Sequence, residues 1–95
     1  MTRYTVVWDK DVETALANAW LLGDSQIRST LTSIADWLDA QLAEDAEIKG
    51  QTFSEPSVRT IDVPLSIATA RVEATYQVFA DDRVVRLTRL VFRSA

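Results

Sequence analysis

Arginine is the residue type in this chain with the clearest chemical potential, because a guanidinium stays charged and donates several hydrogen bonds in a fixed fork. Residues 56–95 hold six arginines against four acidic residues: Arg59, Arg71, Arg83, Arg86, Arg89 and Arg93. Residues 1–55 hold ten acidic and four basic residues. The C-terminal part could therefore present a surface that binds an anion or an acidic partner. The alternative is that the acidic part consists of helices whose outer faces are solvated.

Chemistry that depends on cysteine or histidine is excluded, since the chain contains neither. Their absence removes disulfides, thiolate nucleophiles, the commonest general base and the usual zinc ligands. No stretch resembles the Asp-x-Asp-x-Asp-Gly loop of a calcium site. We therefore expect neither a metal nor a cofactor.

Length and composition indicate one globular domain over residues 1–95. The hydrophobic fraction is 47% and the charged fraction 25%, with only two glycines and two prolines, which argues against disorder. No apolar run is long enough for a membrane span, and the polar start lacks the pattern of a signal peptide. We expect a cytoplasmic protein with no membrane partner.

Two helices are predicted after a short first strand. Asp9 can cap the first helix and Gly23 can end it, while Asp24 and Ser25 can cap the second. The apolar positions recur at helical spacing: Val12, Ala15, Leu16, Ala19 and Trp20 in the first helix, and Ile27, Leu31, Ile34, Ala35, Leu38 and Leu42 in the second. The short connection predicts an antiparallel helical hairpin whose apolar stripes share one core.

The other elements are predicted to be strands and one long loop. Strands are expected at Tyr4–Trp8, at Val58–Val63 closed by Pro64, at Ala70–Val78 and at Val84–Phe92, with a loop over Glu44–Ser57. The result is an α+β fold of order β-α-α-β-β-β. In it, the helical hairpin packs on one face of a small, mainly antiparallel four-stranded sheet.

The register of the last hairpin decides where its arginines point. A three-residue turn would set Glu73 opposite Arg89 and Tyr76 opposite Arg86, whereas a two-residue turn would set Gln77 opposite Arg86. A slip of one residue moves every side chain to the other face. The three-residue turn is preferred here, because it pairs an acid with an arginine on the polar face.

The whole pattern resembles the RelE/ParE superfamily of toxin–antitoxin toxins. The segments that carry the resemblance are Tyr4-Thr5-Val6-Val7-Trp8, Ile34-Ala35-Asp36-Trp37-Leu38, Tyr76-Gln77-Val78, Asp81-Asp82-Arg83-Val84-Val85 and Leu87 to Arg93. Lys49-Gly50-Gln51, Val58-Arg59 and Val63-Pro64-Leu65 also look like plasmid-stabilisation proteins of that superfamily. The resemblance implies either a metal-independent mRNA endonuclease or a toxin that acts by binding a protein.

The chain departs from the nuclease pattern that this resemblance implies. Glu73 stands about three residues before Tyr76, where the nucleases usually have an arginine. The preceding strand offers Arg59 and Asp62 instead of two basic residues, and no C-terminal tyrosine comes before the end at Ala95. The remaining candidates for catalysis are Arg59, Arg89 and Arg93, and those for anion or RNA binding are Arg59, Arg71 and Arg93. A net charge of −4 disfavours binding to nucleic acid or the ribosome.

Three functions stay open on the sequence. The first is a toxin or toxin-like protein that works by protein–protein binding, on a cellular protein target, and is neutralised by a cognate antitoxin. Its candidate partner-binding residues are Trp20, Leu21, Leu22 and Trp37, unless these only close the core. The second is a metal-independent endoribonuclease with a weakened site, so the enzyme question is not decided. The third is a non-catalytic structural or self-associating member of the superfamily.

Overall fold

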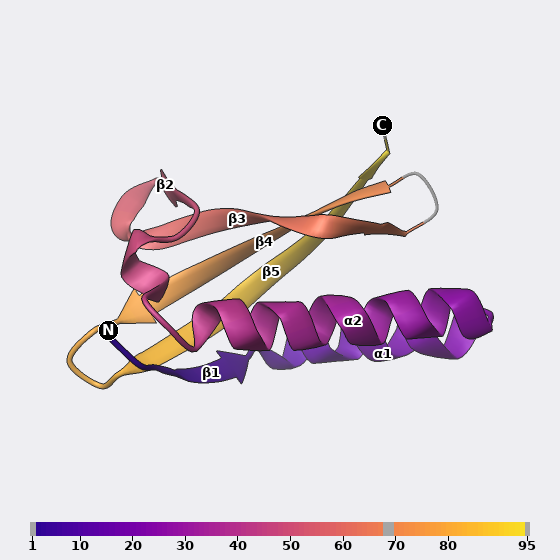
Figure 1. The fold of residues 1–95 in the computed structure, drawn as a ribbon, viewed down its shortest axis with the longest axis horizontal. Helices are drawn as coiled ribbons and strands as arrows, with labels where there is room; N and C mark the ends of the chain where they lie inside the picture. Colours follow the sequence, from indigo (N-terminus) through magenta and orange to yellow (C-terminus); the bar gives the residue numbers. More distant parts are fainter. Residues whose placement is uncertain (1, 68–69, 95) are drawn as a thin grey trace.

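A computed structural model of the chain describes residues 2–67 and 70–94. Its elements follow the order β1 (Thr5–Trp8), α1 (Lys10–Leu22), α2 (Ser25–Leu42), the 3₁₀ turn η1 (Ala46–Ile48), β2 (Gln51–Phe53), β3 (Glu55–Ile67), β4 (Ala70–Phe79) and β5 (Val84–Ser94). The helices form one layer and the strands the other, as Figure 1 shows. The predicted α+β class and the helical hairpin on one face of the sheet are confirmed.

The helix ends follow from local hydrogen bonds. Asp24 accepts a hydrogen bond from the backbone N–H of Ile27 at 2.9 Å and so caps α2. Arg28, one turn into α2, donates from Nε to the carbonyl oxygen of Trp20 at 2.8 Å and satisfies the end of α1. Asp9 occupies the N-cap position of α1 but makes no capping bond, because its carboxylate pairs with Arg86 instead.

The sheet has five strands in the order β1-β5-β4-β3-β2, one more than predicted. β1 pairs in parallel with β5, and the other pairs are antiparallel. The extra strand, β2, lies inside the segment Glu44–Ser57 that was expected to be a loop. β3 also continues past Pro64 to Ile67, because the ladder is irregular between Val63 and Ser66 and so does not need a donor at the proline.

The preferred register of the last hairpin is wrong. Near the turn Gln77 faces Arg86, as a two-residue turn would give, and Tyr76 faces Leu87. A bulge then adds Thr88 to β5, so that Thr75 faces Arg89 and Glu73 faces Val91 rather than Arg89. The Thr88 hydroxyl donates to the carbonyl oxygen of Thr75 at 3.2 Å.

The core lies between α2 and the inner face of the sheet. Val72, Ala74, Tyr76 and Val78 of β4 point inward, because successive side chains of a strand alternate between its two faces. Ile34, Leu38 and Leu42 of α2 belong to the same buried cluster as these β4 side chains, and Leu31 of α2 is buried as well. α1 contributes much less, since Val12 is its only buried residue.

Candidate functional site

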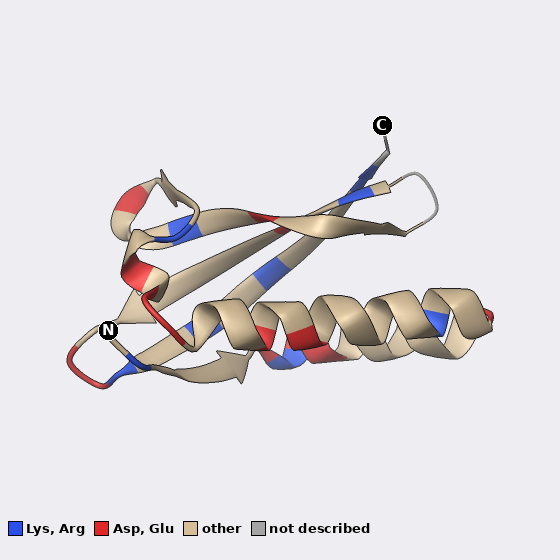
Figure 2. Cartoon of the chain, in the orientation of Figure 1, with Lys and Arg blue, Asp and Glu red and all other residues tan. Residues whose placement is uncertain are grey.

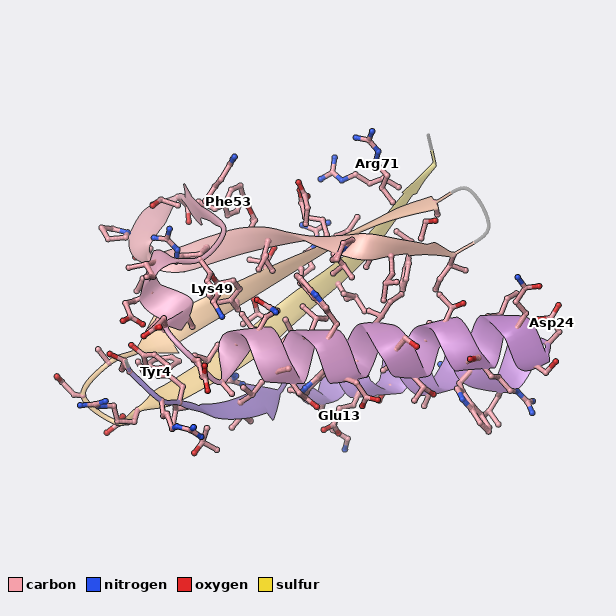
Figure 3. The ribbon with its side chains drawn as sticks, viewed as in Figure 1. Tyr4, Glu13, Asp24, Lys49, Phe53 and Arg71 are labelled. Carbon is pink, nitrogen blue, oxygen red and sulfur yellow. The ribbon has the colours of Figure 1, made fainter. Side chains whose placement is uncertain are left out.

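The face of the sheet that points away from the helices carries the charged candidates. A hollow with a volume of about 420 Å³ opens there, and we call it the polar-face hollow. It is lined by Phe53, Thr60, Glu73, Thr75, Thr88, Arg89, Val91 and Arg93. Figure 2 shows that basic positions lie along β5 and near the start of β4. In Figure 3 the side chains of Phe53 and Arg71 extend on this side.

Acidic residues offset the arginines on this face. Arg93 lies 3.3 Å from a carboxylate oxygen of Glu73, and both side chains are partly exposed. Asp62 sits directly opposite Glu73 in the β3–β4 ladder. Two carboxylates in that relation repel each other and any approaching phosphate. The hollow is therefore mixed in charge rather than positive.

Arg71 and Arg89 share this face but differ in their surroundings. Arg71 faces Arg93 across the β4–β5 ladder, and Arg89 faces Thr75. Both side chains are exposed, and no hydrogen bond or ion pair joins either guanidinium to another residue of the described part of the chain. Three predicted arginines, namely Arg71, Arg89 and Arg93, thus lie on one face of the sheet.

Arg59 lies apart from the other predicted arginines. It faces Tyr76 in the β3–β4 ladder, on the helix side of the sheet. Its Nε donates to the carbonyl oxygen of Lys49 at 2.6 Å, and its other nitrogens reach the Gly50 carbonyl and the Thr52 hydroxyl at 3.3 Å. These contacts tie the segment after η1 to β3. Arg59 is therefore engaged by main-chain acceptors and does not line the polar-face hollow.

Tyr76 holds the same segment from within the core. Its hydroxyl lies 2.7 Å from the carbonyl oxygen of Lys49 and 2.9 Å from that of Ala46, and it can donate to one of them at a time. Burial raises the pKa of Tyr76, although the charge of nearby Arg59 opposes the change. The two acceptors are backbone atoms of the segment around η1, so no side-chain pattern in the sequence indicates these hydrogen bonds.

The apolar candidates divide into three places. Trp20 and Leu21 line a second hollow of about 420 Å³, almost wholly apolar, with Glu13, Leu16 and Ala17; we call it the α1 hollow. Leu22 is 90% exposed but does not line that hollow. Trp37 is partly buried and packs against the core. Of the four candidate partner-binding residues, only Trp20 and Leu21 therefore line the same hollow.

A cluster at the start of the chain was not anticipated. Tyr4 is buried, and its pKa is raised by that burial and by the neighbouring Glu47 carboxylate. Thr2 donates its backbone N–H to the Asp45 carboxylate at 2.7 Å. These contacts hold the N-terminal residues against η1, so the role of the cluster is structural.

In the described residues, no group of three or more acidic, histidine or cysteine side chains is arranged to hold a metal ion. No helix in residues 2–67 or 70–94 has the length and hydropathy that a membrane crossing requires.

Comparison with known proteins gives a fold relationship. No protein-family model and no curated protein sequence matches the chain. The isolated E. coli RelE toxin superposes with a TM-score of 0.63 at 17% identity, covering 97% of this chain and 86% of that one. A doubly substituted E. coli RelE toxin in the free state superposes with a TM-score of 0.62 at 15% identity, covering 95% and 82%. At these identities the likeness shows that this chain has the fold of the RelE toxin.

Proposed function

We propose that the chain is a cytoplasmic toxin-like protein of a bacterial toxin–antitoxin module, of the plasmid-stabilisation kind, which acts by binding another protein. The observation that carries this proposal is the pairing of Asp62 with Glu73 on the polar face of the sheet. A ribosome-dependent nuclease needs a positive surface to approach RNA. Here two carboxylates face each other and one of them neutralises Arg93.

The RelE-like fold and the exposed apolar groups support this proposal. Trp20, Leu21 and Leu22 are exposed at the end of α1, and single exposed apolar residues are common but three in a row are not. A cognate antitoxin could cover these residues, with Trp37 at the edge of the same helical layer. A cellular target protein could use the acidic outer face of the helices or the polar face of the sheet.

The test is a growth assay with induced expression. We expect the wild-type chain to slow bacterial growth, and the product of the adjacent open reading frame to restore growth and to co-purify with the chain. Arg89→Ala with Arg93→Ala should remain toxic, because binding to a protein does not need a phosphate contact. An unchanged growth rate with no co-purifying neighbour would overturn the proposal and would favour the non-catalytic structural alternative.

A metal-independent endoribonuclease is the second candidate, and one observation favours it. Arg89 and Arg93 line the same hollow as Phe53, whose ring could stack on a base while the guanidinium groups stabilise charge on the phosphate. Primer extension on cellular mRNA after induction would reveal cuts in phase with codons if this candidate were correct. The Arg89→Ala variant should then lose the cuts, whereas Arg71→Ala, on the same face but outside the hollow, should keep them.

A further inference from the structure

Strand β2 and the residue on each side of it form a short flap at the edge of the sheet, and we call residues 50–54 the β2 flap. Every residue of the flap is exposed, and Phe53 is exposed to 55%. The flap therefore adds no buried side chain to the core, and the hydrophobic effect does little to hold it in place. Segments with few buried apolar contacts and exposed backbone hydrogen bonds open locally at low free-energy cost.

The backbone at both ends of the β2 flap is left-handed. The angle φ is +65° at Gly50 and +60° at Ser54. A left-handed serine is strained, because its Cβ crowds a neighbouring carbonyl oxygen. The register of β2 against β3 also shifts between Thr52 and Phe53. Hinges are commonly a few residues at the ends of an element that absorb changes in φ and ψ, and Gly50 and Ser54 occupy such positions.

The flap is held at one point by the side chain of Arg59. Lys49, just before the flap, is anchored from the core, since its carbonyl oxygen accepts from the Tyr76 hydroxyl at 2.7 Å. Beyond this anchor, Arg59 donates to the Gly50 carbonyl oxygen and to the Thr52 hydroxyl, each at 3.3 Å and each exposed. In the described part of the chain these two bonds and the short ladder with β3 are what fasten the flap. Arg59 therefore acts as its latch.

Phe53 connects the β2 flap to the polar-face hollow. In Figure 3 its side chain lies on the side of the sheet away from the helices. The other residues that line the hollow belong to β3, β4 and β5, so Phe53 alone comes from the flap. Thr75 of β4 lies in the same hollow and is only partly exposed. A movement of the flap would therefore remove one wall of the hollow and leave the three longer strands in place.

We propose that the β2 flap is a lid on the polar-face hollow, which swings about Gly50 and Ser54 and is latched by Arg59. In the closed state Phe53 forms a wall of the hollow. In the open state Arg59 releases the flap but keeps its bond to Lys49. The lid thereby controls access to the inner part of the hollow. This inference does not depend on the proposed toxin function, since it concerns a motion of the purified chain.

The first test measures access to the hollow by thiol labelling, since the chain has no cysteine of its own. Thr75→Cys places one thiol in the hollow, and its rate of alkylation by neutral iodoacetamide reports how often the hollow opens. Arg59→Ala should raise this rate at least about threefold, because it removes the latch. Phe53→Ala should raise it as well, because it removes the wall. Arg59→Ala added to Phe53→Ala should then give no further increase.

Gln77→Cys is the matched control for this experiment. Gln77 lies on β4 two residues after Thr75, on the same face and similarly exposed, but it does not line the hollow. Its rate of alkylation should be the same with and without Arg59. The control separates an effect of the lid from a change in charge or in overall stability, which would act on both thiols.

The second test locks the lid. Gln51 and Thr60 face each other across the β2–β3 ladder. Opposite residues of an antiparallel pair have Cα atoms about 4.5–5.5 Å apart, which suits a disulfide. In the variant with Gln51→Cys and Thr60→Cys, oxidation should slow amide hydrogen exchange in the flap at least about tenfold, and a reductant should reverse the change. In the reduced protein this exchange should not depend on low urea concentrations, because a swinging lid exposes little new surface.

Three outcomes would overturn the proposal. One is an alkylation rate of Thr75→Cys that neither Arg59→Ala nor Phe53→Ala changes. Another is an equal change at Gln77→Cys. The third is exchange in the flap that is as slow and as dependent on urea as exchange in β4, since β2 would then open only when the whole chain unfolds. If circular dichroism shows that Arg59→Ala does not fold, Phe53→Ala and the disulfide variant decide, because both keep Arg59.

Discussion

Arg59 and Tyr76 should be coupled through one backbone atom, the carbonyl oxygen of Lys49. It accepts hydrogen bonds from Arg59 Nε at 2.6 Å and from the Tyr76 hydroxyl at 2.7 Å. Because the two donors share this acceptor, either can satisfy it when the other is removed. The loss of both would leave a polar atom without a partner. This arrangement predicts that the two substitutions destabilise the fold by more than the sum of their separate effects.

The magnitudes follow from the contacts that remain in each variant. Tyr76→Phe should lower the free energy of unfolding by only about 1 kcal/mol, because both carbonyl oxygens that the Tyr76 hydroxyl contacts keep another donor. The carbonyl oxygen of Lys49 still accepts from Arg59, and that of Ala46 still accepts from the Lys49 N–H at 3.4 Å. Arg59→Ala should lower the free energy of unfolding by roughly 1–2 kcal/mol, since it also removes donors to Gly50 and Thr52 at the protein surface. In the double variant the carbonyl oxygen of Lys49 loses both donors, which should destabilise the fold by about 1 kcal/mol beyond the sum of the two single effects.

The assay is a double-mutant cycle by urea unfolding, followed by circular dichroism at neutral pH. Arg71→Ala serves as the control, because Arg71 is exposed and its removal should change the free energy of unfolding by under about 0.5 kcal/mol. Additive effects within about 0.3 kcal/mol would refute the shared-acceptor reasoning. A stable Arg59→Ala protein that has lost a nuclease activity would also contradict the structural role assigned to Arg59.

Three further predictions concern single positions. Gly50→Ala should destabilise the fold by more than about 2 kcal/mol in chemical unfolding, because φ is +65° and an added Cβ would collide with the carbonyl oxygen of Thr60. A change under about 0.5 kcal/mol would contradict this. Asp24→Ala should lower the free energy of unfolding by about 1 kcal/mol, because it removes the cap of α2. Asp24→Asn, whose side chain can also cap a helix, should retain most of the wild-type stability. Since burial raises the pKa values of Tyr4 and Tyr76 above 10.0, their contribution to stability is complete below pH 10 and is lost as pH rises through the folded-state values. The urea concentration at the unfolding midpoint, measured from pH 8 to 11, should therefore fall above pH 10. The fall should be less steep in Tyr76→Phe than in the wild type. Parallel pH profiles for the two proteins would argue against ionisation of Tyr76 as the cause.

The helices were predictable because their signals are local. Asp24 stands where the cap of α2 is needed, and the stripe of α2 repeats over four turns, so neighbours in sequence define the element. Gly23 ends α1 as expected, although its φ of −85° shows that it does so without a left-handed turn. Local propensity and burial agree in this part of the chain, and the prediction needs no knowledge of the tertiary structure.

The role of Arg59 could not be read from the sequence for a different reason. Its side chain is an arginine on a strand, which the sequence could only describe as a candidate anion contact. Its acceptors are carbonyl oxygens of Lys49 and Gly50, and every residue carries such a group. The three-residue strand β2 was missed on similar grounds, since Gln51–Phe53 pairs with β3 but is exposed and shows no alternation.

The bulge at Thr88 explains why the arginines of β5 can gather on one face at all. If the register near the turn had continued unbroken, Arg89 would face Ala74 and Arg93 would face Ala70, on the side of the core. Two guanidinium groups would then lie against apolar residues, at a cost of several kcal/mol each unless paired. The extra residue moves them to the polar face.

The same insertion serves the apolar residues of the strand. Val85 and Leu87 face the core before the bulge, and Leu90 takes up that position after it, opposite the buried Ala74. Apolar residues stand at both odd and even positions of β5, because the positions that point inward change from odd to even at Thr88. One inserted residue therefore satisfies the core and the charged face together, and it leaves Glu73 within reach of Arg93 rather than Arg89. The charge of the polar face follows from this geometry: of the three arginines of β5, Arg86 pairs with Asp9 and Arg93 with Glu73, and Arg89 has no ion-pair partner in the described part of the chain.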